Sequence, residues 1–258
     1  MTLVVVEVEN HIATITLNRP EAANSMSLAM LHEYKTALET IAHDRTIRVV
    51  LLTGAGNSVF CAGADLKERQ SMDDIQTRQT VALIGDIIRQ TEALPQPVIA
   101  VINGVAVGGG LEISLACDLR VASTSAKVGL TETALGIIPG AGGTQRLARL
   151  IGAGKAKELI YTARRISAEE ALQLGIIEHL YVPELLMSEA KKLAGEMAKN
   201  APLSLIQAKK AIQAGLQTDL ATGLEIEGLA YERLLHSEDR LEGLRAFREK
   251  RAPQFKGQ

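Results

Sequence analysis

PVIAVINGVAVGGGLEISLACDLRVAS, residues 97–123, decides the fold class of this 258-residue chain. It opens with a short apolar run, 97–104, that ends in glycine, which predicts a buried strand. Three glycines then lead into a helix expected over 111–119, and LRVAS predicts the next strand. Strand and helix therefore alternate, and this order favours an α/β architecture.

Glu112 stands in the first turn of the expected helix, directly behind the three glycines. Residues three, four and seven positions apart share a helix face, so Glu112 lies on the same face as Leu115, Ala116 and Leu119. These neighbours are apolar, and the face should be buried. Carboxylates are seldom fully buried without a partner, so Glu112 either caps a polar group or takes part in chemistry.

The alternation extends toward the N-terminus. LVVVEV and HIATITL predict a β-hairpin with its turn at Glu9-Asn10. A helix is expected over 27–43, and RVVLLTG predicts a second buried strand.

A helix over 72–93 follows, and Ser71 and Asp74 have the spacing of a capping box at its start. From about residue 141 the pattern becomes helical, with Ser167 and Glu170 spaced as another capping box. The helices expected there span 142–152, 154–163, 167–175, 183–199, 202–216, 220–235 and 238–249, with Pro183 and Pro202 as first-turn prolines. We expect a core over 1–199 and a helical appendage over 200–258.

Charge and composition narrow the class of protein. A net charge of −2 and a pI near 6.2 give no electrostatic reason to expect nucleic acid or an anionic membrane as partner. No window has the roughly 18 apolar residues of a membrane span, and the opening MTLVVVEVEN lacks the basic start of a signal peptide. Cys61 and Cys117 suit reduced thiols, so we expect a cytoplasmic enzyme or binding protein.

Glu112 and Glu132 are the candidate catalytic residues. They lie 20 residues apart, which leaves room for the chain to return and place both carboxylates beside one site, although each carboxylate could instead complement a helix dipole. Glycine-rich corners in FCAGAD and VAVGGGLE would let backbone N–H groups approach a ligand. Nucleotide-binding, phosphate-loop, serine-hydrolase and metal-ligand patterns are absent from the sequence.

Three longer motifs carry a family resemblance. FCAGADLKE, NGVAVGGGLEISLACD and GLTETALGIIPGAGGTQRL resemble the matching segments of the enoyl-CoA hydratase, or crotonase, family. LNRPEAANSMS and DRLEGLRAFREKRAPQF extend the likeness to nearly the whole chain. The resemblance implies a spiral of ββα units with a C-terminal helical trimerisation region, assembled as a homotrimer or a hexamer made from two trimers.

The resemblance also implies residue roles and an activity. The backbone N–H groups of Ala64 and Gly109 would form an oxyanion hole, and Glu112 and Glu132 would hold the water that adds to a 2-enoyl-CoA. Coenzyme A is then part of the substrate, and no metal or resident cofactor is expected. The residues implied to line the coenzyme A and substrate path are Ala22, Ala23, Ala62, Ala64, Asp65, Leu66, Lys67 and Gly109.

Two carboxylates near one site resist being ionised together, so one of the glutamates should have a raised pKa and keep its proton. The titration would then belong to the pair, and the sequence leaves open which glutamate is protonated.

Short-chain enoyl-CoA hydration ranks first among the family's activities, because both glutamates are present. DLKER and the C-terminal motif also resemble methylglutaconyl-CoA hydratases, whose substrate has a distal carboxylate. Lys67 and Arg69 could bind that carboxylate, contact coenzyme A phosphates or face solvent. An RNA-binding role would need a row of cations, whereas the helix over 28–45 has one lysine, Lys35, before Arg45. A non-catalytic subunit is the remaining alternative.

Overall fold

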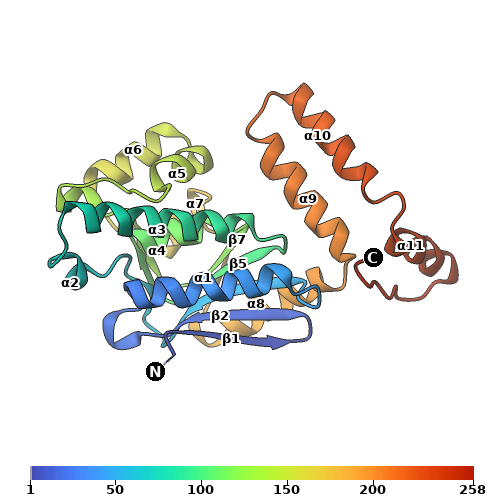
Figure 1. Cartoon of the computed structure of the whole chain (residues 1–258), viewed down its shortest axis with the longest axis horizontal. Coiled ribbons are helices and arrows are strands. Elements are labelled where there is room, and N and C mark those ends of the chain that lie inside the picture. Colours follow the sequence, from blue (N-terminus) through green and yellow to red (C-terminus); the bar gives the residue numbers. More distant parts are fainter. Residues whose placement is uncertain (1) are drawn as a thin grey trace.

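A computed structural model describes residues 2–258, so Met1 of the predicted 1–199 core lies outside this range, and the chain builds two sheets (Figure 1). The larger sheet has the order β1 (Val4–Glu9), β2 (Ile12–Leu17), β3 (Val49–Gly54), β5 (Val98–Ile102), β7 (Leu119–Ser123) and β10 (His179–Tyr181). The smaller sheet has the order β4 (Val59–Cys61), β6 (Val105–Val107), β8 (Lys127–Gly129) and β9 (Ile166–Ser167).

The two sheets grow together along the chain. β3, β5 and β7 are parallel neighbours in the larger sheet, and each is followed by its counterpart β4, β6 or β8 in the smaller sheet. A helical segment then returns the chain to the larger sheet. The expected spiral of ββα units is therefore confirmed.

Helices surround the sheets and continue to the C-terminus. They are α1 (Leu28–His43), α2 (Leu66–Arg69), α3 (Asp74–Ala93), α4 (Gly109–Ala116), α5 (Gly143–Ile151), α6 (Ala153–Thr162), α7 (Ala168–Gln173), α8 (Pro183–Ala198), α9 (Pro202–Gly215), α10 (Leu220–Glu232) and α11 (Glu238–Glu249), with 3-10 helices η1 (Pro20–Ala22) and η2 (Glu132–Leu135). Pro183 and Pro202 begin α8 and α9, as predicted, because the first helical position needs no N–H donor. Within residues 2–258 no helix is both long and apolar enough to cross a membrane.

Side-chain alternation along the strands places apolar residues on both faces of the larger sheet. Leu51 and Val101 pack with Leu186 and Ala190 of α8 on one face. Residues one position along the strands, such as Leu52, enter the main core between the sheets and α1 and α3 on the other face. Both faces are buried, which explains the continuous apolar runs of the central strands.

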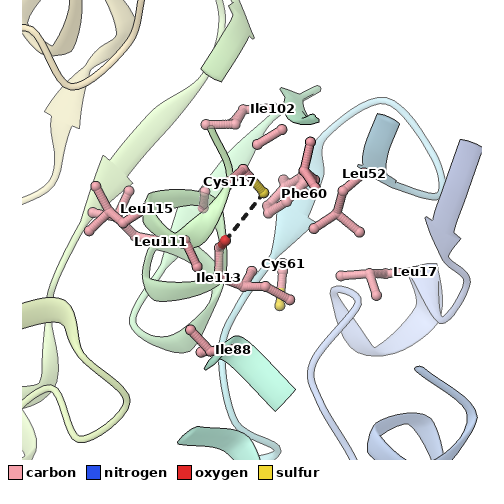
Figure 2. Close-up of a cluster of buried hydrophobic side chains, with 14 of the residues drawn as sticks. Leu17, Leu52, Phe60, Cys61, Ile88, Ile102, Leu111, Ile113, Leu115 and Cys117 are labelled. Atoms are coloured by element: carbon pink, nitrogen blue, oxygen red, sulfur yellow. Dashed lines mark hydrogen bonds between the residues drawn. The ribbon is translucent and has the colours of Figure 1, made fainter. Parts of the chain in front are cut away.

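The main core surrounds α4 with buried side chains and so fixes the position of this helix. Figure 2 shows Leu111, Ile113 and Leu115 of α4 among side chains that include Phe60 and both cysteines. The Cys117 thiol donates to the Ile113 carbonyl at 3.4 Å. Burial raises the pKa of Cys61 and of Cys117 to about 12, so both remain protonated thiols.

The predicted extent of the central helix was wrong. α4 runs from Gly109 to Ala116, so Leu119 begins β7 and does not share the face of Glu112. The helix ends early because Asp118 pairs with the start of β5: its N–H donates to the Val98 carbonyl, and its Oδ2 accepts from the Val98 N–H at 2.7 Å. Burial of the glutamate's face is confirmed, since Glu112, Leu115 and Ala116 are all buried.

The predicted start of α3 was also wrong. Asp73 is the N-cap, and it forms the capping box with Gln76. Ser71 donates instead to the Glu68 carbonyl and so belongs to the end of α2, a short helix that the sequence did not indicate.

Two further corrections concern turns and short strands. The β1–β2 turn lies at Asn10-His11, both with positive φ, rather than at Glu9-Asn10, because Glu9 pairs with Ile12. β9 and β10 interrupt the region expected to be wholly helical beyond residue 141, since strands of two and three residues leave no periodic pattern. Ser167 caps α7 through the Glu170 N–H, while the Glu170 carboxylate pairs with Arg164 instead of closing a capping box.

α9 and α10 lie side by side as a hairpin that projects from the sheets, and α11 lies beyond them (Figure 1). Several large apolar side chains on these helices are exposed. They include Ile212, Leu216, Leu220, Leu224, Leu229, Tyr231, Leu241, Leu244 and Phe247. The division of the chain at residue 200 stays a prediction.

Candidate active site

Two backbone corners, at Ala64 and Gly109, meet at the start of α4. Ala64 follows β4, and Met26 holds its segment from both sides: the Met26 N–H donates to the Gly63 carbonyl at 2.8 Å, and the Met26 carbonyl accepts from the Asp65 N–H at 3.2 Å. The N–H of Ala64, between them, has no acceptor among residues 2–258, and neither has the N–H of Gly109. Two backbone donors are thus free to bind a ligand.

Glycine is required here because the chain segments approach backbone to backbone. A Cβ on Gly63, whose φ is +88°, would lie 3.0 Å from the Gly109 nitrogen. A Cβ on Gly109 would lie 2.5 Å from the Met26 Cε and 3.7 Å from the Ala64 nitrogen. A Cβ on Gly110 would strike the Cys61 carbonyl. The absence of side chains therefore places the Ala64 and Gly109 donors next to each other.

The Glu112 carboxylate lies on the first turn of α4 with only 3% of the residue exposed. Its Oε1 accepts hydrogen bonds from the N–H groups of Ala141 and Gly143, both at 2.8 Å. Burial raises the pKa of Glu112, while these two donors and the positive charge of Arg146 oppose the rise without cancelling it. Oε2 accepts no hydrogen bond from the described residues and is available to a ligand.

The Glu132 carboxylate reaches the same end of α4 from η2. Its Oε1 lies 3.2 Å from the position that a Cβ on Gly108 would occupy. Its Oε2 is buried and has no hydrogen-bond partner in the described part of the chain. Burial, reinforced by the negative charge of Glu112, raises the pKa of Glu132 to about 7 against the weaker effects of nearby backbone N–H groups and Arg69.

The surroundings of the two carboxylates settle the order in which they ionise. Two N–H donors and a nearby guanidinium stabilise the charged form of Glu112. Glu132 has an unpaired, buried oxygen, so its neutral form is favoured. Two carboxyls that differ in their tendency to ionise and two free backbone donors therefore lie at the same end of α4, which is an arrangement suited to acid–base chemistry on a carbonyl compound.

The segments predicted to contact coenzyme A also come together. Ala22 and Ala23 are half-buried at the end of η1, and the Ala23 carbonyl accepts from the N–H of half-buried Ala62 at 3.1 Å. Leu66 and Lys67 are exposed on α2, directly after the Ala64 corner. These residues form one edge beside the free N–H groups.

Asp65 has a structural role within this edge. Its Oδ1 caps α2 by accepting from the Lys67 and Glu68 N–H groups, and its Oδ2 pairs with the Arg19 guanidinium at 2.5 Å. Burial opposes ionisation, but these partners outweigh it and hold the pKa of Asp65 below its usual range. Its carboxylate is thus fully engaged within the protein, and so is its N–H, which donates to the Met26 carbonyl.

A model of the enoyl-CoA hydratase/isomerase family matches residues 7–258. The chain belongs to the enoyl-CoA hydratase/isomerase family. The short-chain-enoyl-CoA hydratase of Clostridium acetobutylicum is 43% identical over 248 residues, which cover 96% of this chain and 95% of that protein. The mitochondrial methylglutaconyl-CoA hydratase of Rattus norvegicus is 44% identical over 257 residues, which cover 98% of this chain and 82% of that protein.

A solved enoyl-CoA hydratase from Bacillus anthracis matches this family member with a TM-score of 0.98 at 54% identity. The match covers 99% of this chain and 100% of that one. The expected crotonase-like α/β fold with C-terminal helices is therefore confirmed.

In this member of the enoyl-CoA hydratase/isomerase family, the partners of Glu112 were not anticipated from the sequence. Ala141 and Gly143 act through backbone N–H groups, which carry no signal of residue type. The glycines of GAGGTQR, just before α5, were the available clue, because such segments expose N–H groups at a helix start.

Proposed function

We propose that this chain is an enoyl-CoA hydratase that reversibly adds water across the double bond of a 2-enoyl-CoA thioester. One observation carries the proposal: the hydrogen-bonded Glu112 on the first turn of α4 and Glu132, whose buried Oε2 lacks a partner among residues 2–258, lie at the end of α4 where the N–H groups of Ala64 and Gly109 are free. The same four residues are those that the family resemblance implies, and the hydratase relatives support the reaction type.

The N–H groups of Ala64 and Gly109 would bind the thioester oxygen. Attack at C3 pushes electrons toward that oxygen, and the two donors stabilise the resulting enolate. Loss of one such donor typically costs about 2.7–4 kcal/mol in the transition state. The N-terminus of α4 adds a favourable dipole, since Gly109 is its first residue.

The two glutamates would divide the proton transfers. Glu112 accepts a proton from water through its free Oε2 as the water oxygen bonds to C3. Glu132 donates its proton to C2 as the enolate returns to the thioester. Exchange with solvent resets the pair. Addition of water involves no change of redox state, so the proposed reaction needs no resident cofactor beyond the coenzyme A of the substrate.

The test compares Glu112→Gln and Glu132→Gln with the unmodified protein, following loss of the enoyl absorbance of crotonyl-CoA. Each substitution keeps the side-chain shape and removes a proton acceptor or donor, so kcat should fall by about 10²–10⁴-fold. Binding of acyl-CoA should change little. Glu39→Gln, on the exposed face of α1, is the control and should leave kcat unchanged. Near-normal turnover in both site variants would refute the proposal.

Methylglutaconyl-CoA hydration is a second candidate, favoured by Arg69. Its Nε is buried without a partner among residues 2–258, and its charge lowers the pKa of Glu132 against burial. A cation with spare hydrogen-bonding capacity next to the site suits a substrate that has a distal carboxylate.

The two substrates distinguish these candidates. If Arg69 binds the carboxylate, Arg69→Met should reduce kcat/KM for 3-methylglutaconyl-CoA at least tenfold more than for crotonyl-CoA, with Arg78→Met, at an exposed position of α3, as control. Equal losses on both substrates would leave short-chain enoyl-CoA hydration as the better assignment.

Assembly as a homotrimer, or as two trimers in a hexamer, is part of the proposal. Exposed apolar side chains on α9, α10 and α11 support it, because isolated monomers rarely leave so many large apolar residues in solvent. Sedimentation velocity should find no monomer at micromolar concentration.

We also propose a cytoplasmic location, which the two buried free thiols suit. We propose no nucleic-acid partner, and a salt-dependent gel shift with RNA would contradict that proposal.

A further inference from the structure

Arg146 joins α3 to the loop that holds Glu112. From α5, its Nε donates to the Glu92 Oε1 at 3.0 Å, and its Nη2 donates to the Glu92 Oε2 at 2.5 Å. Its remaining nitrogen, Nη1, donates to the Ala141 carbonyl at 3.1 Å. Arg146 is mostly buried, with 17% of its side chain exposed, so the guanidinium has a defined place between the two segments.

The segment between these contacts contains Gly142, which departs from ordinary backbone geometry. Gly142 has a φ of +108°, and a Cβ at this position would strike the Arg146 guanidinium. The Ala141 carbonyl faces Arg146, while the Ala141 N–H faces Glu112. The Ala141 side chain packs in the main core, and these two hydrogen bonds orient the peptide groups on either side of it. Loss of the Arg146 contact would remove the restraint on the peptide that joins Ala141 to Gly142.

We propose that Arg146, held by Glu92, is a positioning residue for the Glu112 carboxylate. By holding the Ala141 carbonyl, it fixes the segment between its two donor groups, keeps the N–H groups of Ala141 and Gly143 on the Glu112 Oε1 and leaves Oε2 for the reacting water. The inference rests on the proposed hydratase function, in which Glu112 is the base.

The charges around Glu112 come from three elements. The charge of Arg146 on α5 favours ionisation of Glu112, the charge of Glu132 on η2 opposes it, and Glu92 of α3 offsets part of the arginine charge. Removing the Arg146 charge would raise the pKa of Glu112 further. Because the ionised form of Glu112 is the active base, the acidic limb of the kcat/KM profile would then move to higher pH.

The experiment measures crotonyl-CoA hydration and its pH profile in Arg146→Met, Arg146→Lys and the exchanged pair Glu92→Arg with Arg146→Glu. Arg146→Met should lower kcat by about 10- to 100-fold, with KM changed less than about twofold, because the base is misplaced while the acyl-CoA site is intact. Arg146→Lys keeps the charge and one donor group, so its kcat should lie between that of Arg146→Met and that of the unmodified protein. Arg149→Met, on the exposed side of α5, is the matched control and should behave as the unmodified protein.

The exchanged pair shows whether Arg146 acts by holding the Ala141 carbonyl or only by attaching α5 to α3. It restores an ion pair between the helices, and thermal stability should recover, but a glutamate at position 146 cannot donate to the Ala141 carbonyl. Activity should therefore stay low. Full recovery of kcat in the exchanged pair, or an unchanged kcat and pH profile in Arg146→Met, would overturn the inference.

Glu112→Gln, measured alongside, distinguishes failure of the proposed hydratase function from failure of the positioning role of Arg146. If Glu112→Gln is active, the proposed function itself is wrong. If Glu112→Gln is inactive and Arg146→Met is normal, only the positioning role fails. Should Arg146→Met not fold, Arg146→Lys and the exchanged pair still decide the matter, because each keeps a partner for α3.

Discussion

Glu112 and Glu132 have the same side chain and different surroundings. The Glu112 Oε1 is bound by two backbone N–H groups, whereas the Glu132 Oε2 is buried without a partner within residues 2–258. Burial raises the pKa of both carboxyls, and that of Glu132 reaches about 7. Differences of this kind let one pair of identical residues supply both a base and an acid.

The pH dependence of the proposed reaction follows from this difference. The active form has Glu132 protonated, so kcat/KM for crotonyl-CoA should fall as pH rises through about 7. The decline should disappear from the residual activity of Glu132→Gln, which has no proton to lose. A stopped-flow profile from about pH 6 to about pH 9 checks this, and a flat profile in the unmodified protein would contradict it.

At the scale of elements, α4 and β4 are brought together by glycine. Gly110 lies so close to the Cys61 carbonyl that no side chain fits between them. Leu111, Ile113 and Leu115 then anchor α4 in the core, as Figure 2 shows. The placement of the free N–H groups of Ala64 and Gly109 is therefore a consequence of helix–strand packing, because these donors belong to the two packed segments.

Two glycine substitutions test this packing with opposite signs. Gly110→Ala should lower the free energy of unfolding by about 1–3 kcal/mol, because the methyl group forces α4 away from β4. Gly195→Ala, inside α8 with open space around it, should raise the free energy of unfolding by about 1 kcal/mol through helix propensity. Urea denaturation of each variant measures both, and equal stability of the two variants would count against the packing argument.

At the scale of the whole molecule, α9 docks on the core through charged side chains. The Lys209 Nζ donates to the Asp118 Oδ2 at 2.8 Å and to the Gln96 carbonyl at 3.0 Å, and Lys209 is buried. Gln213 donates to the other Asp118 oxygen at 3.3 Å. Asp118 comes directly after Cys117, the C-cap of α4, so α9 is attached close to the end of the helix that carries Glu112.

Lys209→Met should loosen this attachment. It leaves the Asp118 carboxylate without its cation, and breaking such a pair costs about 3–5 kcal/mol when both partners are buried; Asp118 is partly exposed, so the loss should be nearer to about 3 kcal/mol. Lys210→Met, the exposed neighbour on α9, is the control and should change stability little. Urea denaturation measures the difference, and sedimentation shows whether assembly weakens with it. Equal stability of the two variants would contradict the docking role.

The sequence alone determined those features that depend on neighbours along the chain. Apolar runs located the central strands, Ser167 was placed at the start of α7 and Pro183 and Pro202 at the starts of α8 and α9, and helical spacing put Glu112 on a buried face. The order of three glycine-rich motifs, through family resemblance, indicated the spiral fold and the candidate residues.

Only the tertiary structure decided what depends on groups far apart in the chain. Glu112 meets the N–H groups of Ala141 and Gly143, 29 and 31 residues away, and Arg146 meets Glu92 across 54 residues. Asp118 ends α4 early through its bonds to Val98, 20 residues away. The sequence could not show either that Glu132 has its pKa raised to about 7, because a pKa depends on burial and on nearby charges, and folding sets both.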